Sequence, residues 1–99
     1  MITRSEENYL KTIFSVFMQT QNNVSTNEIA NLLDTSPASV TEMIKKLQEK
    51  NLVIYEKYNG VRLSNEGETK AIAIINKINR ILLFRFIIKY ILSMSYKNE

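Results

Sequence analysis

The chain has 99 residues, 44% of them hydrophobic and 23% charged, and a formal net charge of +3. This length fits one domain with a modest core, and the composition excludes wholesale disorder. Cysteine and histidine are both absent, which excludes disulfides, thiolate chemistry and the commonest general base and transition-metal ligand.

The first helix is predicted over about residues 5–19, because apolar side chains recur there at helical spacing. Thr3 and Glu6 form a capping-box pattern at its start. The side chains that we expect in the core are Leu10, Ile13, Phe14, Phe17 and Met18. The polar residues 19–24 that follow are predicted to form a loop.

Two shorter helices come next, and each begins with a capping pattern. Ser25 and Glu28 form a second capping box. After a tight connection, Ser36 suits the N-cap and Pro37 the first position of a helix that runs to about Lys50. The expected buried residues are Ile29, Leu32 and Leu33 in the second helix and Val40, Met43, Ile44 and Leu47 in the third.

A β-hairpin is predicted after the third helix, which Asn51 is expected to end in the left-handed conformation. Residues 53–57 and 61–63 favour strands. Asn59-Gly60 lies between them, and this dipeptide is the strongest short-range signal for a hairpin turn. The pattern therefore predicts a two-stranded wing.

The rest of the chain predicts one long helix over residues 65–94, which contain no proline and only Gly67. The fold class is thus mainly α: a winged helix-turn-helix of three helices and a two-stranded wing, followed by a long C-terminal helix. We assign residues 1–64 to a DNA-binding domain, 65–94 to a possible dimerisation helix and 95–99 to a polar terminus. Two apolar stripes along the helix favour a homodimer, with an unstructured remnant as the alternative.

The third helix occupies the position of a DNA-recognition helix. Its first exposed residues are small or hydrogen-bonding, which suits the major groove, and Lys50 near its end could reach a phosphate. The candidate DNA-binding residues are Thr26, Ser36, Pro37, Ala38, Ser39, Thr41, Glu42, Lys45, Lys46, Asn59 and Arg62, with Lys57 and Tyr58 beside them at the hairpin tip. In the alternative interpretation these lysines only form i,i+4 pairs on a solvated helix, Glu42 with Lys46 and Lys45 with Glu49.

Three segments carry a family resemblance: SEENYLKTI at residues 5–13, SPASVTEMIKKL at 36–47 and LVIYEKYNGVRL at 52–63. They resemble the first helix, the recognition helix and the wing of the diphtheria-toxin-repressor family of iron- and manganese-dependent repressors, which includes the manganese transport regulators. The resemblance covers roughly residues 3–75. It implies a dimeric repressor that binds palindromic operators in double-stranded DNA when loaded with Mn²⁺ or Fe²⁺.

The family's metal-ligand positions carry other residue types in this chain. By resemblance, an Asp or Met ligand corresponds to Asn8, a Glu to Lys11 and a His to Ile78 or Asn79. The resemblance places the remaining ligands and the dimerisation domain after the residues of this chain. We therefore expect no cofactor here, and a metal sensor that is lost or truncated.

Other classes of function find less support. No acid–base pair or nucleophile constellation is visible, so we expect neither an enzyme nor a small-molecule substrate. Without a signal peptide or an apolar run of about 18 residues, we expect a cytoplasmic protein with no membrane partner. The alternative to a DNA-binding regulator is a protein-interaction module that has a winged-helix fold and associates through its long last helix. DNA affinity would fall steeply with salt, whereas apolar association would not.

Overall fold

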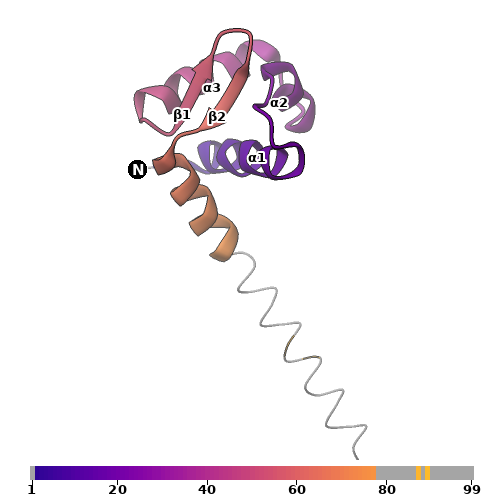
Figure 1. The fold of residues 1–99 in the computed structure, drawn as a ribbon, viewed down its shortest axis with the longest axis vertical. Helices are drawn as coiled ribbons and strands as arrows, with labels where there is room; N and C mark the ends of the chain where they lie inside the picture. The colour runs from indigo at the N-terminus through magenta and orange to yellow at the C-terminus, as the bar shows by residue number, and fades with distance from the viewer. Residues whose placement is uncertain (1, 78–86, 88, 90–99) are drawn as a thin grey trace, which may run out of the picture.

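The computed structural model describes residues 2–77, 87 and 89. Its elements in chain order are α1 (Arg4–Thr20), α2 (Thr26–Leu32), α3 (Pro37–Glu49), β1 (Val53–Glu56) and β2 (Gly60–Leu63), and residues 65–77 are helical as well. Figure 1 shows the three helices packed around the hairpin, with helix 65–77 leaving on the side away from the wing tip. This order confirms the predicted winged helix-turn-helix. Of the long helix predicted over residues 65–94, residues 65–77 are helical, and 78–94 lie outside the described residues except for 87 and 89.

Local capping explains where the helices begin. At α1 the backbone N–H of Glu6 donates to Thr3 Oγ1 at 3.1 Å, and the Glu6 carboxylate accepts from the Thr3 N–H at 2.9 Å. Ser25 accepts from the Glu28 N–H at 3.0 Å, which is the hydroxyl half of the predicted second box. At α3, Ser36 is the N-cap and proline is the first helical residue, as predicted.

One core joins the three helices and the hairpin. The buried side chains are Tyr9, Leu10, Ile13, Val16, Val24, Ile29, Ala30, Val40, Ile44, Leu47, Leu52, Val53, Val61, Leu63 and Ala71. The prediction was wrong for Met18 and Leu32, each 56% exposed. Met18 follows Ile13 by five residues, which turns it about 140° away around the helix. Around α2, the position of Leu33 falls between the buried Ile29 and Ala30, and that of Leu32 falls outside them.

An ion pair between α1 and α3 closes one edge of this core. Lys50 Nζ lies 2.8 Å from Oε2 of Glu6, whose side chain is 4% exposed. The hydrogen bond from Lys50 lowers the pKa of Glu6 to about 2, and the hydrogen bond from the Thr3 backbone adds to the shift. Lys50 therefore links two helices, and its phosphate contact stays a prediction.

Residue Val24 corrects the predicted loop before α2. Its N–H donates to the Val61 carbonyl at 2.8 Å, and its carbonyl accepts from the Val61 N–H at 2.8 Å. Val24 therefore pairs with the edge of β2 that β1 leaves open. The predicted Asn59-Gly60 turn also shifts, because Glu56 pairs with Gly60 and the turn consists of residues 57–59. Gly60 has φ +90°, and a Cβ there would lie 2.6 Å from the Val24 carbonyl oxygen. The glycine thus serves this close approach.

Helix 65–77 is anchored to the end of α3. Ser64 caps it by accepting from the Gly67 N–H at 3.0 Å, and the Ser64 hydroxyl donates to the Asn51 carbonyl at 2.6 Å. Gly67 lies directly against the Leu52 carbonyl, where a Cβ would clash. Ala71 is fully buried in the core cluster, so packing of the domain continues past residue 64. No helix within the described residues is long and apolar enough to cross a membrane.

Candidate nucleic-acid interface

The turn between α2 and α3 fixes the direction of the candidate recognition helix. Asp34 adopts the left-handed conformation with φ 52°, and the Thr35 N–H donates to the Ala30 carbonyl at 2.9 Å. This bond folds the turn back onto the last turn of α2. The chain can then enter α3 within four residues of leaving α2, which is the geometry of a helix-turn-helix.

We call the exposed side of α3 the recognition face. Its members are Ser36, Pro37, Ala38, Ser39, Thr41, Glu42, Lys45 and Lys46, all of them exposed. Three hydroxyls are already bonded within the helix start: Ser36 donates to Ser39 Oγ at 2.9 Å, and Thr41 donates to the Pro37 carbonyl at 3.0 Å. The predicted α3 residues therefore lie together on one accessible surface.

The two lysines of this face point to solvent. Among the described residues, no carboxylate lies within 4.0 Å of the ammonium of Lys45 or Lys46, so the i,i+4 pairs of the alternative interpretation are not formed. Glu42 lies on the same face and contributes a negative charge. Both ammonium groups are thus available to an external anion.

The candidate residues of the wing are bonded to one another. Arg62 Nε donates to Glu56 Oε1 at 3.0 Å, and the amide of Asn59 donates to Glu56 Oε2 at 3.4 Å. These bonds lower the pKa of Glu56, the one from Arg62 most. Arg62 is exposed between the buried Val61 and Leu63, so strand alternation puts it on the outer face of the hairpin. The structure therefore does not bring Arg62 to the recognition face.

The tip of the wing presents an aromatic ring. Tyr58 is 91% exposed and has φ 72°, a conformation that bulky side chains rarely adopt. The ammonium of Lys57 lies 5.4 Å from the centre of its ring. Tip and ring form a projecting, positively charged end of the hairpin.

A groove beside the recognition face contains two residues that the sequence analysis missed. It is lined by Thr26, Thr41, Ile44, Lys45, Gln48 and Tyr55, and has a volume of about 160 Å³. Tyr55 pairs with the buried Val61, so its side chain lies on the same face of the hairpin as the core. Strand alternation could have identified Tyr55, had the register been known.

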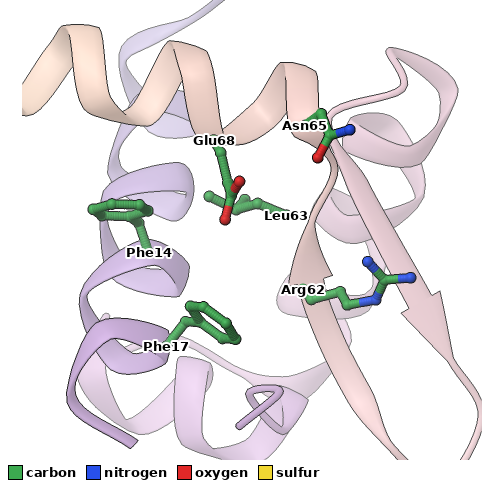
Figure 2. Close-up of a pocket in the computed structure, with 6 residues that line it drawn as sticks. All are labelled: Phe14, Phe17, Arg62, Leu63, Asn65 and Glu68. Atoms are coloured by element: carbon green, nitrogen blue, oxygen red, sulfur yellow. The ribbon is translucent and has the colours of Figure 1, made fainter. Parts of the chain in front are cut away.

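A second pocket lies on another side of the domain (Figure 2). Phe14 and Phe17 of α1, Leu63 at the end of β2, and Asn65 and Glu68 of the last helix surround it. In Figure 2 the Arg62 guanidinium points away from the two phenylalanine rings. None of its lining residues belongs to α3, so it is separate from the recognition face.

The metal ligands implied by the resemblance can be tested against the described residues. Asn8 is exposed on α1, beside a polar pocket that also contains Asp34 of the α2–α3 turn. No group of three His, Cys, Asp or Glu side chains able to hold a metal ion occurs among residues 2–77, 87 and 89. One amide and one carboxylate do not match the ligand sets of Mn²⁺ or Fe²⁺.

A helix-turn-helix with an exposed second helix and an adjoining wing defines a winged-helix DNA-binding domain. Residues 1–61 match the model of a family described as iron dependent repressor, N-terminal DNA binding domain, and the chain belongs to this family.

Similar proteins agree with this membership. The chain is 35% identical over 83 residues to an HTH-type transcriptional regulator of Methanocaldococcus jannaschii, covering 84% of this chain and 66% of that protein. It is 33% identical over 85 residues to the HTH-type transcriptional regulator MntR of Shouchella clausii, covering 86% and 53%. A crystal structure of ScaR with bound Zn²⁺ superposes with a TM-score of 0.63 at 35% identity, covering 73% of this chain and 33% of ScaR. The chain thus spans half to two thirds of the length of the two regulators and a third of ScaR.

Proposed function

We propose that this chain binds double-stranded operator DNA as the reading head of a transcriptional regulator, acting in the cytoplasm and without catalysis. The observation that carries the proposal is the recognition face, where small side chains lead and two unpaired lysines follow. In this assignment α3 enters the major groove and the wing tip contacts the neighbouring backbone.

The dimensions of α3 suit this role. Its 13 residues span about 20 Å, and the small Ala38 and Ser39 near its start allow the helix to approach base edges closely. Glu42 follows within one turn, and a carboxylate there would accept a hydrogen bond from the cytosine amino group. Lys45 and Lys46 come later and are long enough to reach phosphates. The face therefore combines base contacts at its start with charge neutralisation further along.

The proposal treats the chain as independent of metal. Family membership suggests Mn²⁺ or Fe²⁺, but the donor set around Asn8 does not fit either ion. The recognition face is already exposed, and the turn that orients it is held by backbone hydrogen bonds. We propose that α3 needs no bound ion to take up its orientation.

A single head would read one half-site, so we also propose that the chain works as a homodimer. Ile72, on the helix that leaves the domain, is 42% exposed, and Ile87 is 44% exposed. Of the predicted stripes, Ala71 and Ile74 pack on the domain's own core, Ile87 is exposed, and the other apolar residues lie outside the described residues. The same exposed side chains favour the second candidate function, a protein-interaction module that associates through this helix and does not bind DNA.

A salt titration of DNA binding tests the proposed function and separates the two candidates. The parent should bind a labelled duplex with an affinity that falls steeply as salt rises. Replacing Lys45 and Lys46 by Gln should weaken binding to every duplex and lower the salt slope by about two units, one for each lost phosphate contact.

The matched control replaces Lys70 and Lys77, which are exposed on the last helix, by Gln. This variant has the same net charge and should bind almost as the parent does. Equal losses in the two variants, or a parent with no affinity for duplex DNA, would contradict the recognition assignment and leave the interaction module.

A further inference from the structure

We infer that the groove lined by Thr26, Thr41, Ile44, Lys45, Gln48 and Tyr55 is a seat for one DNA backbone phosphate, with Tyr55 and Gln48 as phosphate contacts. We call it the phosphate groove. The inference rests on the proposed function and adds a particular contact to it: three neutral donors beside one lysine, at the flank of the recognition face.

The chemistry of the lining carries the first step. A hydroxyl from Thr26, an ammonium from Lys45, an amide from Gln48 and a phenol from Tyr55 are all hydrogen-bond donors. The six lining residues include no carboxylate. The surface of the groove is mostly apolar, so these four donors set its polarity, and phosphate oxygens accept bonds from all of them.

The second observation is that these donors have no internal hydrogen-bond partner. Within residues 2–77, the side chains of Thr26, Lys45, Gln48 and Tyr55 have no hydrogen bond or ion pair to another residue. The hydroxyls of Ser36 and Thr41, by contrast, are bonded inside the helix. Four donors that line one groove and have no internal acceptor are available to an external one.

The third observation is the position of the groove relative to α3. Tyr55 comes from β1, Thr26 from the first turn of α2, and Lys45 and Gln48 from α3, so three separate elements meet at the groove. The groove also lies along the flank of α3, directly beside the recognition face. A duplex whose major groove receives α3 places a phosphate backbone along each side of that helix. The groove stands where one of these backbones passes.

The neutral character of most donors gives a distinctive test. Tyr55→Phe keeps the ring and removes only the hydroxyl, and Thr26→Val is a similar replacement. Each should weaken binding about tenfold for all duplex sequences alike, because a phosphate contact carries no sequence information. Neither should alter the salt slope, since neither removes a charge. Lys45→Gln should lower both affinity and slope.

Gln48→Glu supplies an independent test by placing a carboxylate in the groove, and it should weaken binding more than tenfold. Asn76→Asp is its matched control, since it makes the same amide-to-acid change on an exposed part of the last helix. The measurement is fluorescence anisotropy of the full chain with several labelled duplexes at four salt concentrations. Thermal unfolding by circular dichroism should show that all variants remain folded.

Three outcomes decide the matter. Sequence-independent losses for Tyr55→Phe and Thr26→Val at unchanged slope, with a larger loss for Gln48→Glu than for Asn76→Asp, support the phosphate groove. If Tyr55→Phe and Thr26→Val bind as the parent does and Gln48→Glu binds as Asn76→Asp does, while Lys45→Gln still loses affinity, the phosphate groove is overturned. The proposed function then stands. If the parent binds no duplex even at low salt, both the proposed function and the groove are overturned.

Discussion

Replacing Glu6 by Gln should destabilise the domain by an amount that depends on pH. The pKa of Glu6 is lowered from 4.5 to about 2, chiefly by Lys50. At about 1.4 kcal/mol for each pKa unit, this shift corresponds to about 3 kcal/mol at neutral pH. Because the Lys50 side chain is 40% exposed, solvent screens part of the attraction, and we expect a loss of about 2 kcal/mol. Gln keeps the carbonyl oxygen that accepts from the Thr3 N–H, so the capping bond survives and the change isolates the charge.

The sign of the pH dependence follows from the lowered pKa. The stabilisation is complete above about pH 4.5, where the carboxylate is ionised in both the folded and unfolded states. It falls as the pH drops toward 2, because the unfolded chain takes up a proton first. Urea unfolding of parent and variant, followed by far-ultraviolet circular dichroism, should give a difference at about pH 3 that is less than half the difference at about pH 7. Lys50→Met should show the same trend, and the double variant should cost less than the two single changes together. An equal gap at both pH values would refute the ion pair as the cause.

Three further predictions concern the wing, the metal and the assembly. Gly60→Ala should lower the free energy of unfolding by more than about 2 kcal/mol, since the added Cβ meets the Val24 carbonyl at positive φ. The control Asn59→Ala should be nearly neutral. Equal effects of the two changes in urea unfolding would contradict this. Thermal melts with and without about 100 μM Mn²⁺ should coincide, and a rise in melting temperature that a chelator reverses would show a functional metal site. Sedimentation should reveal self-association that strengthens with salt, because Arg80, Arg85 and Lys89 repel their counterparts in a second copy; a strict monomer at high micromolar concentration would contradict the proposed homodimer.

The order of elements could be predicted because its signals are local. Caps at Thr3, Ser25 and Ser36 lie next to the helices they start, and the apolar period identifies six of the nine buried apolar residues of α1, α2 and α3. Pro37 likewise marks the start of α3 within its own first turn.

The errors share a different cause, which is dependence on residues far apart in the chain. Val24 looks like loop sequence because its strand pairing is a single bridge to Val61, 37 positions later. The ion pair of Lys50 could not be predicted either, because its partner Glu6 lies 44 positions away.

The candidate interface shows the same division. The exposed positions of α3 follow from helical period alone, so they could be named from sequence. The side of the hairpin on which Tyr55 and Arg62 lie depends on strand register, and a shift of one residue exchanges the two faces. The observed register assigns Tyr55 to the face next to α3 and Arg62 to the outer face, where Glu56 neutralises it.

The close contact between Gly67 and the Leu52 carbonyl fixes the angle at which helix 65–77 leaves the DNA-reading domain. Both the direction of this helix and the rotation about its axis are passed on to any segment that follows its last turn. Inserting one residue between 75 and 77, past the core contact of Ile74, would move that segment by only about 1.5 Å, but would rotate it by about 100° around the helix axis. The head itself would be unaffected. In a pair of domains joined through this helix, the length of the helix would therefore set the rotation of one domain relative to the other. That rotation determines which faces of the DNA the two copies contact.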